Sequence, residues 1–231
     1  MEKKAQGYFT LGEKWLWTAS VMAILVSFFA FDRANYCTLA ASLVGVTSLI
    51  YNAKGNPAGQ VLMIVFSLLY GYISYSVAYY GEMITYVGMT GPMAAVALVA
   101  WLRNPYKGNR AEVKVNRITG REQGLMWLLA AAVTAVFYFI LKYFNTANLL
   151  PSTLSVTTSF VAVYLTFRRS PWFALAYAAN DVVLIVLWAL AAREDPSCLA
   201  VLVCFAAFLA NDLYGFFSWR RMERRQMGNQ A

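Results

Sequence analysis

Residues 171–188 read PWFALAYAANDVVLIVLW and place an asparagine and an aspartate in the middle of an otherwise apolar run. The run is long enough to form a membrane-spanning helix. A carboxylate near the middle of a bilayer costs several kcal/mol unless it faces a polar cavity or a cation, so Asp181 is a candidate site residue. At helical spacing Tyr177 and Trp188 share its face, which puts an aromatic ring on either side of the carboxylate.

A second stretch, FLANDLYGFFSW at 208–219, repeats this spacing of aromatic residues and acid. Asp212 takes the place of Asp181 and Trp219 the place of Trp188. The sequence therefore predicts two helices that each carry an acid beside aromatic rings.

The composition is that of a membrane protein: 60% of residues are hydrophobic and 13% are charged, against about 25% charged in soluble domains. Apolar runs of near-spanning length lie at 15–31, 35–52, 58–80, 83–102, 124–144, 147–167, 171–192 and 198–219. We therefore expect an all-α protein with eight transmembrane helices. The first run lacks a small-residue cleavage site, so it is expected to remain as a helix and not to act as a signal peptide.

The distribution of Lys and Arg predicts the orientation. With both termini on one side, sixteen of these residues fall on that side, and three, Arg33, Lys142 and Arg193, fall on the other. The positive-inside rule then makes both termini cytoplasmic. The net charge of +8 reflects orientation signals, and we expect no nucleic-acid binding.

Several kinds of chemistry are disfavoured by what the sequence lacks. There is no histidine and no C-x-x-C, so no metal or cofactor site is expected. No G-x-x-x-x-G-K-[ST] loop is present, so the chain does not hydrolyse ATP itself. Cys37 and Cys198 fall at the same predicted membrane face, so a disulfide between them is one alternative. The preferred interpretation is that all three cysteines, including Cys204, are packing residues.

A polar segment at 103–123 separates three of the predicted helices from four, and this predicts a repeat. Asn56-Pro57 and Ser170-Pro171 occupy matching turns, and Trp101 and Trp219 close matching helices. We therefore expect two parallel triplets joined by one linker helix. The predicted divisions are listed from the N-terminus: an extra helix at 1–34, a first triplet at 35–102, a loop and linker helix at 103–145, a second triplet at 146–221 and a cytoplasmic tail at 222–231.

Together the three-one-three plan, AYAANDVVLIVLW and ANDLYGFFSW resemble the PnuC family of bacterial vitamin transporters, whose fold is related to that of the SWEET sugar transporters. Members that carry nicotinamide riboside have a W-x-x-W-x-x-x-N pattern. Here Phe173 and Ala176 stand in place of the tryptophans before Asn180, so thiamine and riboflavin, which relatives carry, are kept as alternatives. The resemblance implies facilitated diffusion in the bacterial inner membrane, trapping by a cytoplasmic kinase, and a homo-oligomer, with a trimer as the expected form.

Candidate substrate-binding residues come from the polar and aromatic positions of the predicted helices. They are Gln60, Phe66, Tyr70, Tyr164, Tyr177, Asn180, Asp181, Trp188, Asn211, Asp212 and Tyr214. Acids beside aromatic rings suit a flat cationic ring, because a counter-ion and cation–π contacts act on the same group. Nicotinamide riboside and thiamine carry such a ring, whereas riboflavin is neutral, and nicotinamide riboside is the preferred interpretation.

Other interpretations of these residues remain open. Asp181 can be a buried packing residue, and Asp212 can pair with Arg220 or Arg221. Asn180 and Asp181 are about 100° apart on a helix, so it is open whether both face the centre. Two acids on adjacent helices also allow an intramembrane aspartyl enzyme, although G-x-G-D is absent. A receptor or assembly subunit is disfavoured because the only long polar segment, 21 residues, is short.

Overall fold

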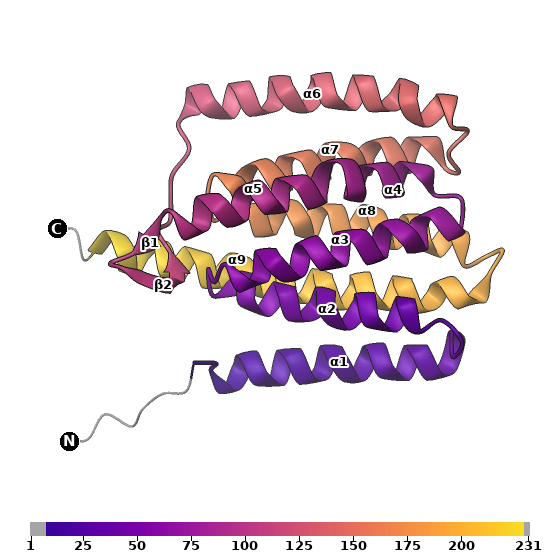
Figure 1. Cartoon of the computed structure of the whole chain (residues 1–231), viewed down its shortest axis with the longest axis horizontal. Coiled ribbons are helices and arrows are strands. Elements are labelled where there is room, and N and C mark those ends of the chain that lie inside the picture. The colour runs from indigo at the N-terminus through magenta and orange to yellow at the C-terminus, as the bar shows by residue number, and fades with distance from the viewer. Residues whose placement is uncertain (1–7, 229–231) are drawn as a thin grey trace.

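The structure is a computed structural model that describes residues 8–228 (Figure 1). Its elements in order are α1 Leu11–Phe31, α2 Tyr36–Ala53, α3 Ala58–Ser76, α4 Tyr80–Thr85, the π-helix η1 Tyr86–Thr90, α5 Gly91–Leu102, β1 Pro105–Tyr106, β2 Asn109–Val113, α6 Gly120–Tyr143, α7 Leu149–Phe167, α8 Phe173–Ala191, the 3₁₀-helix η2 Pro196–Cys198 and α9 Leu199–Gly228. Within this range eight segments are long and apolar enough to span a membrane, with α4, η1 and α5 forming one of them. The predicted all-helical membrane fold is confirmed.

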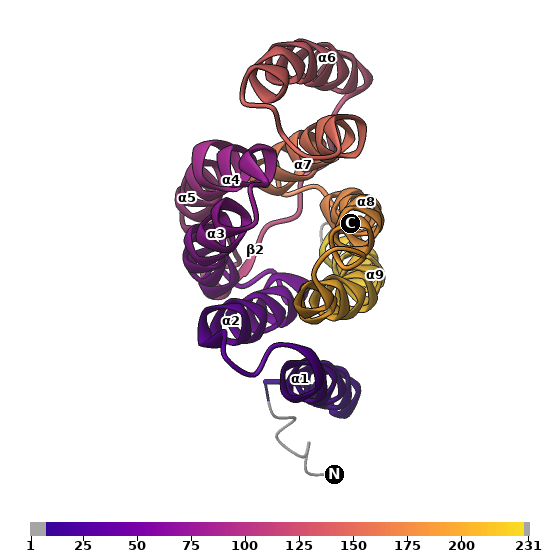
Figure 2. The same ribbon diagram turned by 90° about the vertical axis from the view of Figure 1, so that its right-hand side faces the viewer.

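Six of the eight spans form a closed ring (Figure 2). Each helix contacts the next in the order α2, α3, α5, α7, α8, α9, and α9 returns to α2. α1 lies outside the ring against α2 and α9, and α6 lies outside it against α7. α1 and α6 are thus the outer helices, which agrees with the expected roles of extra helix and linker.

Two tight turns at the same end of the bundle have matching geometry. In the α2–α3 turn Gly55 has a φ of 66°, and in the α7–α8 turn Arg169 has a φ of 56°. The next residue in each turn donates its backbone N–H five residues back, Asn56 to Tyr51 and Ser170 to Leu165, at 3.0 Å in both cases. Both turns then enter a helix just after a proline.

The two tryptophans at the ends of α5 and α9 also make matching contacts, and each reaches across to the other triplet. Trp101 Nε1 donates to the Thr166 carbonyl on α7 at 2.9 Å, and Trp219 Nε1 donates to the Asn52 carbonyl on α2 at 2.7 Å. Their rings lie 5.4 Å apart, centroid to centroid. This reciprocal exchange supports the interpretation of two parallel triplets.

Residues 105–117 cover the end of the bundle where the described chain begins and ends (Figure 1). The hairpin of β1 and β2, not expected from sequence, packs on the last turns of α9, where Gln226 bonds to the Val113 carbonyl and the Val115 N–H. The end of β2 and the segment after it contact both matching turns, through Val113 N–H to the Gly55 carbonyl and Asn116 N–H to the Arg169 carbonyl. The predicted tail at 222–231 therefore begins inside α9, which runs to Gly228, and residues 229–231 lie outside the described range.

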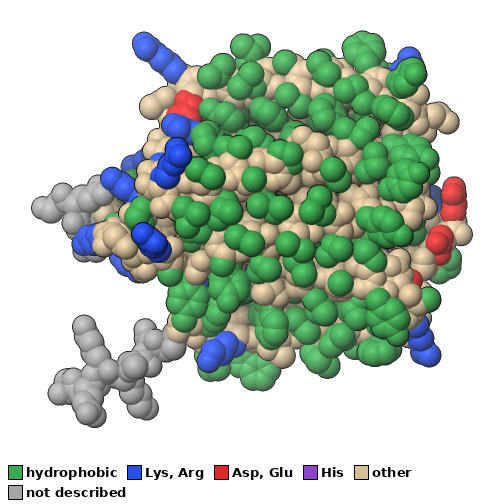
Figure 3. All heavy atoms as spheres, viewed as in Figure 1, with side chains coloured by type: hydrophobic (Ala, Val, Ile, Leu, Met, Phe, Trp, Pro, Cys, Tyr) green, Lys and Arg blue, Asp and Glu red, His purple; other side chains and the backbone are tan. Residues whose placement is uncertain are grey.

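Side chains on the viewed face follow the predicted orientation. Hydrophobic side chains cover the sides of the bundle, and Lys and Arg gather at the end that carries the hairpin (Figure 3). Lys3 and Lys4, which were counted for the same end, lie outside the described residues. Cytoplasmic placement of this end remains a prediction. The three cysteines are free thiols, so no Cys37–Cys198 disulfide forms.

Candidate functional site

A pair of facing carboxyl groups lies at the centre of the ring. Asp181 on α8 is 3% exposed and Asp212 on α9 is 4% exposed, and the two side chains lie close enough to interact electrostatically. Tyr177, one helical turn from Asp181, lies next to both. Asp181 Oδ2 has no hydrogen-bond partner among the described residues. Two carboxylates this close repel each other unless a proton or a cation lies between them, so the pair is suited to hold a positive charge.

Asn180 also faces the interior, on a different side of α8. Its Oδ1 accepts from Thr158 Oγ1 at 2.7 Å and from Ser159 Oγ at 3.1 Å, both on α7. These two donors fix the orientation of the amide, so its nitrogen is left to donate on the side where Tyr86 lies. Asn180 faces α7 and η1, whereas Asp181 faces α9. These two consecutive residues of α8 therefore both point toward the interior of the ring.

Next to these polar groups six rings form what we call the aromatic cluster: Phe66, Tyr70, Tyr86, Trp188, Phe205 and Phe208. Tyr70 lies at its middle, with its centroid 4.4 Å from Tyr86, 5.2 Å from Phe205 and 5.5 Å from Phe66. Trp188 Nε1 donates to the Tyr70 hydroxyl at 2.7 Å. The rings therefore contact one another directly, and the centre is closed in this structure.

Two backbone features make room for the aromatic cluster. A Cβ on Gly45 of α2 would stand 2.2 Å from the Phe208 ring and 2.9 Å from the Phe66 ring, so these rings occupy the space of a missing side chain. Tyr86 projects from η1, and π-helical turns inside α-helices occur frequently at functional sites.

Glu82 on α4 was not expected as a site residue, yet it is fully buried. One carboxyl oxygen accepts from Ser155 on α7, and Oε2 has no partner among the described residues. The apolar run predicts a helix that begins at residue 83, whereas α4 begins at Tyr80. The apolar run does continue back through Tyr79 and Tyr80, and that signal would have brought Glu82 into the membrane.

Four predicted residues lie away from this centre. Asn211 Nδ2 donates to Ser20 and the Tyr214 hydroxyl donates to Glu13, so this face of α9 holds α1. Gln60 bonds to Asn52 near the matching turns, and Tyr164 bonds to Glu122 at the start of α6. In each case a peripheral helix or a helix end occupies the face on which the residue lies.

The alternative pairing of Asp212 with a terminal arginine is not found. Arg220 pairs with Glu223, at 2.5 Å, and Asp212 faces Asp181. Of the predicted residues, the centre therefore collects Phe66, Tyr70, Tyr177, Asn180, Asp181, Trp188 and Asp212.

Comparison with known proteins gives a consistent family. Residues 35–221 match the family described as nicotinamide mononucleotide transporter. A protein of Neisseria mucosa named nicotinamide riboside transporter PnuC is 27% identical over 222 residues, which are 92% of this chain and 82% of the relative. A protein of the same name from Haemophilus influenzae is 20% identical over 195 residues, 83% of this chain and 82% of the relative.

The fold also resembles a solved structure. The crystal structure of the vitamin B3 transporter PnuC superposes with a TM-score of 0.84, covering 95% of each chain at 23% identity.

Proposed function

The chain belongs to the nicotinamide mononucleotide transporter family, and we propose that the substrate it moves is nicotinamide riboside. It is a multi-pass membrane transporter and not an enzyme, so the intramembrane aspartyl enzyme is set aside. The observation that carries the choice of substrate is the buried pair Asp181 and Asp212 beside the aromatic cluster.

The site is suited to a flat organic cation. A cation on an aromatic face gains about 2 kcal/mol when it is desolvated, and a carboxylate acts on the same charge. The pyridinium of nicotinamide riboside offers both a flat ring and a charge. Binding requires the packed rings around Tyr70 to separate, since their centroids now lie 4.4–6.0 Å apart.

The charge of the centre favours the riboside over the mononucleotide of the family description. A phosphate monoester carries about −1.5 to −2 charges at neutral pH. Asp181, Asp212 and Glu82 are the ionisable acids buried here. Lys and Arg of residues 8–228 lie at helix ends and in loops, so none stands beside this centre to pair with a phosphate.

Polar groups around the acids match the rest of the substrate. The nitrogen of Asn180 is held as a donor by Thr158 and Ser159, and it suits the carboxamide oxygen or a ribose hydroxyl. The unpartnered Oε2 of Glu82 is an acceptor that suits a ribose hydroxyl.

The transport mode that we propose is facilitated diffusion across the bacterial inner membrane, with net uptake maintained by phosphorylation in the cytoplasm. The sequence has no phosphate-binding loop for ATP, which supports a gradient-driven process. A cytoplasmic kinase would be the functional partner, and the chain would assemble into a homo-oligomer with a trimer as the expected form.

Titration calorimetry with the purified chain tests the substrate. We expect heat from nicotinamide riboside, and weaker or no binding of nicotinamide mononucleotide and riboflavin. Binding of thiamine without binding of nicotinamide riboside would overturn the substrate and leave the family intact. Tighter binding of the mononucleotide would contradict the charge reasoning above.

A further inference from the structure

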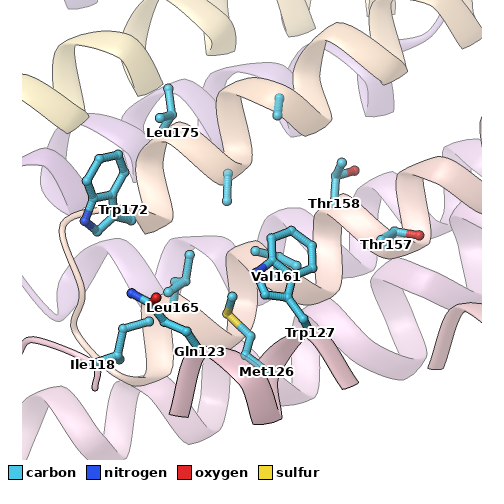
Figure 4. Close-up of a pocket in the computed structure, with 12 residues that line it drawn as sticks. Ile118, Gln123, Met126, Trp127, Thr157, Thr158, Val161, Leu165, Trp172 and Leu175 are labelled. Carbon is cyan, nitrogen blue, oxygen red and sulfur yellow. The ribbon is translucent and has the colours of Figure 1, made fainter. Parts of the chain in front are cut away.

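A groove of about 390 Å³ opens on the side of the bundle between α6, α7 and α8 (Figure 4). Its wall is mostly apolar and includes Trp127, Val161 and Leu175. None of the lining residues, all of which lie in the described part of the chain, is charged. The groove is separate from the aromatic cluster, because none of the six rings lines it.

The groove runs along one half of the membrane. On α8 it extends from Trp172, at the basic end of the bundle, to Ala179. The seven steps between these two residues span about 10 Å at 1.5 Å per residue, against about 15 Å for one leaflet of the hydrocarbon core. An acyl chain of the leaflet at the basic end therefore has the length and the chemistry to fill it.

A second cavity of about 170 Å³ forms the mouth of this groove and shares Ile118, Gln123 and Trp172 with it. Arg117 and Arg220 line the mouth and both pair with the single carboxylate of Glu223. Two positive charges and one negative charge leave a net charge of +1 there.

The two guanidinium groups remain accessible to a further anion. The Arg117 side chain is 66% exposed and that of Arg220 is 36% exposed. The Arg220 guanidinium lies over the Trp172 ring, 5.5 Å from its centroid, which holds it at the level of the groove entrance.

We propose that the groove and its basic mouth together bind one anionic phospholipid. The phosphate bonds to Arg117 and Arg220, and one acyl chain lies between α6 and α8. A basic pocket between transmembrane helices is the usual form of a site for an acidic headgroup. The charge at the mouth favours a lipid over a second copy of this chain, whose apolar helices would leave the net charge of +1 without a second anion.

Native mass spectrometry of the full chain in detergent tests this, with dioleoyl phosphatidylglycerol and dioleoyl phosphatidylcholine titrated separately. We expect one phosphatidylglycerol to bind about fivefold more tightly than phosphatidylcholine, the value for one net charge. Arg117→Gln should bring the two affinities close to parity, and Arg220→Gln serves the same purpose if the first variant does not fold. Lipid binding is measured in place of uptake because Thr158 lines the groove and also bonds to Asn180.

A second pair of variants tests the acyl-chain part of the site. Ala179→Phe fills the inner end of the groove and should weaken phosphatidylglycerol binding about fivefold or more. Ala132→Phe is the matched control, since Ala132 is also exposed on a spanning helix but does not line the groove, and it should bind as the parent does. Equal affinity of the parent for both lipids, or unchanged binding by Ala179→Phe, would overturn the proposal. So would a loss of chain–chain assembly in Ala179→Phe with lipid binding unaltered.

Discussion

Replacing Asp181 with asparagine separates a substrate site from a packing residue. The change keeps the shape of the side chain and removes one of the two facing acids at the ring centre. Losing one partner of a buried charge pair costs about 2–5 kcal/mol in binding. Because Asp212 remains to face the cation, we expect the lower end, about 2 kcal/mol or roughly a 30-fold weaker affinity for nicotinamide riboside.

The same substitution should leave the fold intact or make it more stable. Asp181 Oδ2 has no hydrogen-bond partner among the described residues, and the facing Asp212 opposes its charge. Removing a repulsive buried charge is neutral or stabilising. The expected result is therefore weaker binding together with an unchanged or raised melting temperature.

Calorimetry and a thermal melt of the same preparation give both readouts. Glu194→Gln is the matched control, because it removes one negative charge from an exposed position outside the spanning helices. Its affinity and melting temperature should equal those of the parent chain. If Asp181→Asn binds nicotinamide riboside as tightly as the parent while its melting temperature falls, Asp181 is a packing residue and the reasoning above is refuted.

Three further predictions follow from the same structure. Gly45→Ala should destabilise the fold by about 1–3 kcal/mol through overpacking, because its Cβ would lie 2.2 Å from the Phe208 ring, whereas Gly12→Ala meets nothing within 4 Å and should leave the melting temperature unchanged. A cysteine at position 110, on β2, should react with an impermeant thiol reagent only from the cytoplasmic side, and labelling from outside would reverse the topology. Uptake of nicotinamide riboside into liposomes should stop at equal concentrations on both sides, so accumulation under a proton or sodium gradient would identify an ion-coupled transporter.

The sequence predicts the features that depend on a single helix and on the membrane around it. Apolar length gave the eight spans, and the cost of a midplane carboxylate singled out Asp181 and Asp212, which lie together at the centre. The helical period of α8 puts Tyr177 and Trp188 on the face of Asp181, and in the structure Tyr177 lies near Asp181 and Trp188 is fully buried. These signals are local, since each needs only the spacing within one helix.

What the sequence leaves open is which neighbour covers each face. Asn211 and Tyr214 share a face of α9 as expected, but α1 packs against that face. The sequence of α1 does not indicate where in the bundle this helix packs. Glu82 was missed because a helix boundary was placed three residues late, and one such shift moves an acid from a loop into the membrane. Both differences arise from the packing of helices and from the position of helix ends, which local sequence propensity determines only weakly.

Although the ring contains two triplets with matching turns, its central site is asymmetric and would bind the substrate in one preferred orientation. Position 66 of α3 corresponds to position 180 of α8 when the matching turns are aligned. The first triplet therefore has a phenylalanine where the second has an asparagine. Each triplet supplies three rings to the aromatic cluster, whereas Asn180 and both central aspartates come from the second triplet alone. A ligand with a flat ring and polar hydroxyls therefore meets rings from both triplets, but it meets the amide and both aspartates from one triplet only. Exchanging the two residues, with Phe66→Asn and Asn180→Phe in one chain, should preserve the ring of helices but abolish binding of nicotinamide riboside, because the amide would lose its Thr158 and Ser159 partners and face away from the acids. Retained affinity in that double variant, measured by calorimetry beside each single variant, would mean that the asymmetry does not orient the substrate.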